Sequence, residues 1–251
     1  NLSEANYLNQ PLLIDSSQGS NKFWLANWLT DRGLRAVEVS HSAPCLNKNC
    51  GAGEFSPTQE WTFAEARESP HHLIRQLPIC EPGMLVGAAI DGDGDRCLLI
   101  ESTSNGFRVI DGDRIADAFI NCVSNSGFAW RLAASIESDL SLTTNLDRFP
   151  QPVKPSETAV GDRWLSVSLA DGNLNDSITG ETFPQLIGVE DSGHVVLPSP
   201  HPVDAQRWSL VGDGAMTLVA YLLSTVNLNQ ATLMNRCLLY TSPSPRDVRS
   251  S

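Results

Sequence analysis

Apolar and polar positions along the first forty residues predict two strands separated by a helix. Short apolar runs at Pro11–Asp15 and Leu34–Val39 predict buried strands. Between them, apolar residues at helical spacing predict a helix over Asn21–Arg32, which Gly33 ends. The apolar side of this helix is expected to carry Phe23, Leu25, Trp28 and Leu29. A strand, a helix and a second strand in this order form a βαβ unit, which implies a parallel sheet.

The next sixty residues predict a long loop, a second helix and two further strands. Residues His41–Thr58 are rich in Gly, Pro and Asn, and loops of this length are more often functional than idle. A helix is expected over Trp61–Gln76. The apolar runs Met84–Ile90 and Cys97–Glu101 predict strands on either side of a short polar segment.

The pattern beyond about residue 110 predicts a second unit of the same kind. A helix is expected over Arg114–Val123, with Ile115, Ala118, Phe119 and Cys122 at helical spacing. Strand and turn signals alternate through Leu165–Leu169, and Leu186–Val189 predicts another strand. A last helix is expected to begin near Gly214.

The predicted fold class is α/β, with two consecutive α/β domains whose mixed, mostly parallel sheets are flanked by helices. We place the first domain at residues 1–108 and the second at 109–236, although no internal sequence repeat relates them. Residues 237–251 break the preceding helical pattern and are expected to be an artefactual tail, with a natural flexible tail as the alternative. Because the chain starts without Met, we expect a fragment of a longer protein.

Composition narrows the classes of partner. The 251 residues are 41% hydrophobic and carry a net charge of -12, so they can build real cores and repel nucleic acid and anionic membranes. We therefore expect no nucleic-acid or membrane partner. The sequence shows no apolar run of about 20 residues and no signal peptide at its start, which favours a cytoplasmic protein. The six cysteines form no CxxC pair and are expected to be reduced thiols.

The strongest chemical signal lies between the predicted strands Met84–Ile90 and Cys97–Glu101. Three carboxylates, Asp91, Asp93 and Asp95, alternate there with glycines, which permit the backbone angles needed to turn the oxygens toward one centre. Such an oxygen cluster is a site for a hard cation. With three protein ligands, Mg²⁺ would keep open positions for water or a phosphate oxygen.

Other interpretations of this acidic loop fit less well. A calcium EF-hand loop needs Gly at position 6 and Glu at position 12, but those positions hold Arg96 and Ser102. An acidic hairpin turn in water is the remaining structural alternative. Arg96 could hold a phosphate oxygen beside the metal or form a salt bridge to a neighbouring aspartate.

Two loops resemble those of the α-D-phosphohexomutases, which interconvert sugar 1-phosphates and 6-phosphates. Gly87–Arg96 resembles the family's metal-binding loop, and Glu190–His194 resembles its sugar-recognition loop. Further matches follow in the family's order at Asp15–Gly19, Asp111–Asp113, Val160–Arg163 and Asp213–Ala215. The resemblance covers about residues 11–234, and two specific loops in the right order make chance agreement improbable.

The resemblance implies roles for seven residues. Asp91, Asp93 and Asp95 would bind Mg²⁺; Glu190, Ser192 and His194 would bind the sugar or brace its loop; and Arg96 would be a possible phosphate contact. The family has four domains, and this chain resembles the second and third. The implied isomerase reaction moves a phosphoryl group between the 1 and 6 positions of a hexose or hexosamine phosphate, through a phosphoserine and a bisphosphate intermediate. The serine would lie outside this chain, which therefore holds no catalytic nucleophile and would be inactive alone.

The sequence also departs from the family pattern. Val189 stands where many members have Gly, which could narrow the sugar-recognition loop or shift its backbone. Ala159 stands where many have Lys or Arg, which puts phosphate affinity in doubt. The segment Asn47–Gly51 resembles one found in the hexosamine-phosphate branch, but glucose and mannose phosphates stay open as substrates.

Two other functions remain as alternatives. The chain could be a non-catalytic module that binds Mg²⁺ and a sugar phosphate. It could also be a hydrolase with a carboxylate nucleophile on the Asp91 loop, which predicts a trapped phosphoaspartate analogue at Asp91 or Asp93.

Overall fold

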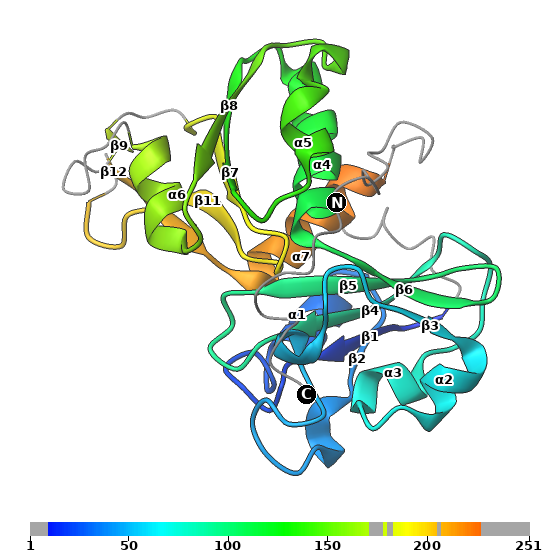
Figure 1. Ribbon diagram of the computed structural model, residues 1–251. Coiled ribbons are helices and arrows are strands. Elements are labelled where there is room, and N and C mark those ends of the chain that lie inside the picture. The colour runs from blue at the N-terminus through cyan, green and yellow to red at the C-terminus, as the bar shows by residue number, and fades with distance from the viewer. Residues whose placement is uncertain (1–9, 171–177, 180–182, 205–206, 227–251) are drawn as a thin grey trace.

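The computed structural model of the chain describes residues 10–170, 178–179, 183–204 and 207–226. Strands in these ranges form two six-stranded sheets, which make up the two lobes of the molecule in Figure 1. The first sheet has the strand order β2-β1-β4-β5-β6-β3, and the second has the order β8-β7-β10-β11-β12-β9.

The first sheet contains β1 (Leu12–Asp15), β2 (Ala36–Glu38), β3 (Glu60–Thr62), β4 (Leu85–Ile90), β5 (Cys97–Ser102) and β6 (Gly106–Ile110). Strand β1 pairs in parallel with β2 and β4, and the remaining pairs are antiparallel. Its helices are α1 (Leu25–Asp31), α2 (Phe63–Glu68) and α3 (His72–Gln76), and the long loop after β2 holds two short 3₁₀ turns, η2 (Ser40–Ser42) and η3 (Ala52–Glu54).

The second sheet contains β7 (Trp130–Ser135), β8 (Val153–Thr158), β9 (Ile178–Thr179), β10 (Leu186–Val189), β11 (Val195–Pro200) and β12 (Arg207–Gly212). Here β7 pairs in parallel with β8 and β10, and the other pairs are antiparallel. The accompanying helices are α4 (Gly112–Val123), α5 (Leu140–Thr144), α6 (Asp162–Leu169) and α7 (Gly214–Thr225), with 3₁₀ turns η4 (Ser124–Ser126) and η5 (Leu146–Arg148).

The two sheets have the same topology. Each strand of the first sheet has a counterpart at the same place in the second, so that β4 corresponds to β10 and β5 to β11. This structural repeat was invisible in the sequence. The predicted α/β fold of two mixed sheets flanked by helices is confirmed. Because the strand orders match, the β4–β5 loop and the β10–β11 loop are structurally equivalent.

Alternating side chains divide each sheet between two cores. On β5, Leu98 and Ile100 pack in a core that α2 and α3 cover, whereas Cys97 and Leu99 belong to a larger core on the opposite face of the sheet. On β10, Leu186 packs in a small core with α6, whereas its neighbour Ile187 belongs to the same larger core. Helix α7, orange in Figure 1, lies between the two lobes and contributes to that shared core.

The shared core fixes how the two sheets sit on each other. Leu218 and Leu222 of α7 are fully buried, as are Leu99 of the first sheet and Ile187 of the second. Burying one such side chain contributes about 1.5–3 kcal/mol, so the two lobes are joined by a substantial apolar contact rather than by a flexible tether. The domain boundary near residue 108 stays a prediction.

The prediction of one continuous helix over Trp61–Gln76 is wrong, because a strand and two separate helices occupy this range. Residues Glu60–Thr62 form β3, and Thr62 then caps α2 in a capping box with Glu65. Helix α2 ends at Glu68 because Pro70 disfavours the helical conformation at the preceding residue, Ser69. Helix α3 begins only at His72.

Three smaller predictions also need correction. Phe23 precedes α1 and is 81% exposed instead of facing the core, although Leu25 and Leu29 are buried as expected. Helix α4 confirms the helix expected over Arg114–Val123, but Cys122, which was grouped with its apolar residues, is exposed. The stretch Leu165–Leu169 is part of helix α6, since two leucines four residues apart form one buried helical stripe.

The predicted tail at 237–251 lies outside the described residues. Within the part that is described, none of the helices combines the length and apolar character required to span a bilayer.

Candidate functional site

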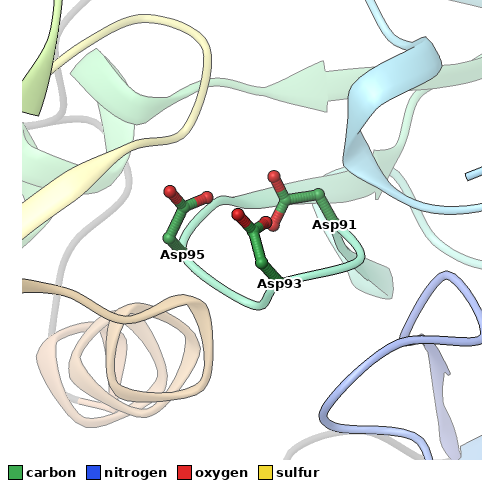
Figure 2. A group of neighbouring side chains, drawn as sticks. All are labelled: Asp91, Asp93 and Asp95. Atoms are coloured by element: carbon green, nitrogen blue, oxygen red, sulfur yellow. The ribbon is translucent and has the colours of Figure 1, made fainter.

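The acidic loop connects β4 to β5 and projects from the carboxyl end of the first sheet. Its carboxylates point into a common region in Figure 2, and one oxygen from each of Asp91, Asp93 and Asp95 lies within 4.8 Å of the others. Asp91 is buried, Asp95 is half-buried and Asp93 is exposed. The loop therefore forms a cup of oxygen atoms that is closed at its base and open to solvent.

Arg96 holds Asp91 at the base of the cup. Its Nε atom donates to Asp91 Oδ2 at 2.7 Å, and its backbone N–H donates to Asp91 Oδ1 at 3.2 Å. Burial raises the pKa of Asp91, but these hydrogen bonds and the guanidinium charge outweigh it and lower the pKa below its usual value. Asp91 is thus a carboxylate at neutral pH. The geometry shows Arg96 in a salt bridge, and a phosphate contact stays a prediction.

Asp95 has a different electrostatic environment. Burial, followed by the negative charge of Asp91, raises the pKa of Asp95 to about 6, while nearby His194 acts in the opposite direction. The Nδ1 atom of His194 lies 3.8 Å from Asp95 Oδ2. The other oxygen, Asp95 Oδ1, is buried without a hydrogen-bond partner. Its nearest positive group is Arg96 Nε at 3.7 Å, beyond hydrogen-bonding distance, so this oxygen beside two other carboxylates fits a cation ligand.

Backbone contacts fix the acidic loop from both sides. On one side, the N–H of Ser20, from the turn after β1, donates to the Gly92 carbonyl at 3.0 Å. On the other side, the N–H of Gly214, at the start of α7, donates to the Gly94 carbonyl at 2.7 Å. Gly94 has a φ of 92°, which a residue with a side chain rarely adopts. The cup is therefore held by segments from both lobes.

The equivalent loop of the second sheet, residues 190–194, places Glu190 beside a third segment. Glu190 is 6% exposed, and its Oε1 atom accepts a hydrogen bond from the N–H of Gly161. Its Oε2 atom accepts from Ser192 Oγ at 3.4 Å. His194 is also buried, and its Nε2 atom has no hydrogen-bond partner. The loop thus holds two buried polar groups with unused hydrogen-bonding capacity.

The two loops are directly joined. The N–H of Cys97 donates to the Gly193 carbonyl at 2.9 Å, and Arg96 pairs with His194 as an isolated antiparallel bridge. Gly193 makes this approach possible, since it has a φ of 89° and a Cβ there would lie 2.4 Å from the Cys97 carbonyl oxygen. Residues about a hundred positions apart thus form one continuous site.

The four supporting segments from the sequence all reach these two loops. Gly19 of the Asp15–Gly19 turn would place a Cβ 2.1 Å from the Gly92 carbonyl oxygen. In the Asp111–Asp113 segment, the N–H of Gly112 donates to the Asp191 carbonyl at 3.1 Å. The Val160–Arg163 segment reaches the second loop through Gly161, and the Asp213–Ala215 segment reaches the first through Gly214.

Sequence reasoning missed how these supporting segments act. It did not single out Ser20, whose hydroxyl donates to the Asp93 carbonyl at 3.0 Å in addition to its backbone contact. It included Gly214 in the matching segment Asp213–Ala215, at the start of a helix, but did not predict its contact with the acidic loop. The glycine after the capping Asp213 was the available signal, because glycine at a helix start often marks a close backbone approach.

The residues of the acidic loop fit a hard cation such as Mg²⁺. All donors are carboxylate oxygens, they converge, and the open side of the cup leaves coordination positions for water or a ligand. Among the residues that the structure describes, this is the group of acidic, histidine or cysteine side chains close enough to hold a metal ion.

Comparisons with known proteins confirm the resemblance to the α-D-phosphohexomutases. No family model matches the sequence. The phosphoglucosamine mutase of Corynebacterium aurimucosum is 30% identical over 211 residues, covering 82% of this chain and 38% of that protein. That of Jannaschia sp. is 27% identical over 224 residues, covering 88% of this chain and 41% of that protein.

Solved structures show the same fold. Aspergillus fumigatus N-acetylphosphoglucosamine mutase, in complex with GlcNAc-6P and magnesium, matches with a TM-score of 0.61 at 18% identity, covering 93% of this chain and 48% of that one. An N-acetylglucosamine-phosphate mutase of the α-D-phosphohexomutase superfamily, in a product complex, gives 0.58 at 16% identity, with coverages of 90% and 46%. The chain thus spans less than half the length of the relatives it matches.

Proposed function

We propose that this chain supplies the Mg²⁺-binding and sugar-binding part of a phosphohexomutase active site. The reaction is the transfer of a phosphoryl group between the 1 and 6 positions of a hexose or hexosamine phosphate, through a phosphoserine and a bisphosphate intermediate. One observation carries the proposal: the hydrogen bond from the Cys97 N–H to the Gly193 carbonyl holds the acidic loop against the Glu190 loop. A metal ion and a sugar bound at these loops would be neighbours.

The acidic loop would hold the metal through Asp91, Asp93 and Asp95. Mg²⁺ bound there would neutralise negative charge on the phosphoryl group during transfer. Arg96 fixes the position of Asp91 by its two hydrogen bonds, and its half-exposed side chain can also reach a phosphate oxygen. These residues supply positioning and electrostatic stabilisation, which is most of what an enzyme contributes to phosphoryl transfer.

The second loop would orient the sugar. The Glu190 carboxylate can accept hydrogen bonds from sugar hydroxyls with the lone pairs left free by Gly161 and Ser192. The Ser192 hydroxyl can donate or accept one more. His194 ends this second loop and its Nδ1 atom faces Asp95 at 3.8 Å, so we assign it the bracing role rather than direct sugar contact.

The substrate class is proposed to be a hexosamine phosphate. Support comes from the names of the relatives, several of which are phosphoglucosamine mutases, and from the solved complex with GlcNAc-6P. The chain covers less than half of the relatives' length, and the phosphoserine would be contributed from outside these 251 residues. We therefore expect no mutase turnover by this chain alone. Measurable turnover would favour a different catalytic arrangement.

Glu190→Gln tests the sugar-binding role. The substitution keeps the size of the side chain but removes its charge and one acceptor, so we expect glucosamine 6-phosphate affinity to fall about tenfold. Calorimetric titration with the sugar phosphate measures this directly. Mg²⁺ affinity should stay within about twofold of wild type, because Glu190 is not among the metal-facing carboxylates. Unchanged sugar-phosphate binding would remove Glu190 from the site.

Cation binding at the acidic loop should depend on pH through Asp95. Because the pKa of Asp95 is raised to about 6, this carboxyl carries a proton at pH 5 and has lost it at pH 7. The cation must displace that proton at the lower pH, so we expect about tenfold weaker Mg²⁺ binding at pH 5 than at pH 7. Titrations in matched ionic strength measure the trend. Equal affinity at both values would show that Asp95 is not a ligand.

A further inference from the structure

Two loops with unusual backbone angles contact the acidic loop at Gly92. In the described part of the chain, the residues other than glycine with positive φ are Ser17, Gln18, Asn47 and Asn49, with φ between 54° and 60°. Asparagine tolerates this conformation, but serine and glutamine rarely adopt it. All four lie in the turn after β1 or in the segment 45–50, which we call the brace loop. Such strain persists only where surrounding contacts enforce it.

The contacts that enforce it join the turn to the brace loop. The buried Ser17 hydroxyl donates to Asn47 Oδ1 at 2.5 Å, and the N–H of Asn47 donates to the Ser17 carbonyl at 3.2 Å. The N–H of the same serine donates a hydrogen bond to the carboxylate of Asp15 at 2.9 Å. Asn47 is therefore bound by its side chain and its backbone to the same serine, although the residue itself is exposed.

Asn47 also lies against the acidic loop. A Cβ added at Gly92 would be 2.8 Å from Asn47 Nδ2 and 2.9 Å from Leu46 Cδ1, so the brace loop touches Gly92 with no spare room. Gly92 separates Asp91 from Asp93. A movement of Gly92 would change the distance between these two carboxylates. The uncharged Asn47 side chain can therefore affect the loop through its geometry, without changing its charge.

We propose that Asn47 is a positioning residue for the acidic loop: held by Ser17, it packs on Gly92 and sets the spacing of the Asp91 and Asp93 carboxylates. This inference rests on the proposed cation site and adds a residue that acts on the site without touching the ion. It predicts that loss of the Asn47 side chain weakens cation binding even though no ligand is removed.

Asn47→Gly is the sharpest test, because glycine accepts the positive φ and only the amide side chain is lost. Asn49→Gly is the matched control: it has the same φ in the same loop, and its described hydrogen bonds are made by its backbone. With Mn²⁺ as the probe ion, we expect about tenfold weaker binding for Asn47→Gly and no more than twofold for Asn49→Gly. The electron paramagnetic resonance spectrum of bound Mn²⁺ should also change in Asn47→Gly, since it reports ligand geometry.

Wild-type affinity and spectrum in Asn47→Gly, or an equal loss in Asn49→Gly, would overturn the inference. Ser17→Ala serves as a second variant, because it removes the donor to Asn47 and leaves Asn47 in the sequence; it should weaken Mn²⁺ binding in the same direction. If Asn47→Gly fails to fold, the result for Ser17→Ala decides. Asp93→Asn separates the two proposals. Retained Mn²⁺ affinity in Asp93→Asn would reject the cation site itself, whereas its loss with normal binding in Asn47→Gly and Ser17→Ala would reject only the positioning role.

Discussion

Replacing Asp93 by asparagine is expected to weaken Mg²⁺ binding about 10- to 100-fold, equivalent to about 1.4–2.7 kcal/mol, without destabilising the protein. Asp93 is the exposed member of the three carboxylates. Its charge adds to the repulsion that raises the pKa of Asp95, so its removal relieves the folded protein of an unfavourable interaction. The same removal deprives a cation of one charged ligand. Calorimetric Mg²⁺ titration and thermal unfolding, run on the same sample, measure both effects.

Asp91→Asn is the matched comparison, since it removes the same charge from the same loop at a buried position. Asp91 accepts three hydrogen bonds, from the N–H of Gly94 and from the backbone and side chain of Arg96. We expect Asp91→Asn to lose Mg²⁺ affinity and also about 1–2 kcal/mol of stability, a modest figure because the Arg96 side chain is 38% exposed. Equal stability losses in the two variants would contradict the different roles assigned to the two aspartates.

Gly193→Ala is expected to give the largest loss of stability, about 2–5 kcal/mol, or roughly 5–15 °C in the midpoint of thermal unfolding. Two costs combine at this position. The φ of 89° is strained for any residue with a side chain, and the new Cβ would lie 2.4 Å from the Cys97 carbonyl oxygen and 2.9 Å from Leu98 Cδ2. Backbone cannot move aside cheaply, so the contact between the two loops must open.

Two other glycines separate these costs. Gly127 has a similar φ of 87° but open space where a Cβ would go, so Gly127→Ala should cost only the backbone term of about 1–2 kcal/mol. Gly53 has neither a positive φ nor a close neighbour, and Gly53→Ala should be neutral or slightly stabilising. Thermal unfolding of the three variants should rank them in that order. A Gly193→Ala protein as stable as Gly127→Ala would show that the loops are not in close contact.

The sequence was most informative where structure depends on neighbouring residues. The acidic loop was predictable because the strands on either side are uninterrupted apolar runs and the three aspartates alternate with glycines. The strand β4 was placed to within one residue for the same reason. The error over Trp61–Gln76 was local too: Thr62 is a capping residue and Pro70 a helix breaker, and both signals stand in the sequence.

What the sequence could not show depends on contacts between distant residues. The hydrogen bond from Cys97 to Gly193 joins residues almost a hundred positions apart, and no local pattern specifies it. The shared strand order of the two sheets is likewise a property of tertiary structure. Phe23 fits an apolar helical stripe, yet it is exposed because the helix begins two residues later, at Leu25.

A cation at the acidic loop and a sugar phosphate at the Glu190 loop are expected to bind as neighbours. The most direct test is calorimetric titration of glucosamine 6-phosphate into the chain, with and without Mg²⁺. A bound cation attracts the negative charge of a neighbouring phosphate, so we expect Mg²⁺ to strengthen sugar-phosphate binding at least about fivefold. Asp93→Asn should abolish this enhancement. Identical sugar-phosphate affinity with and without Mg²⁺, or no binding under either condition, would contradict the account.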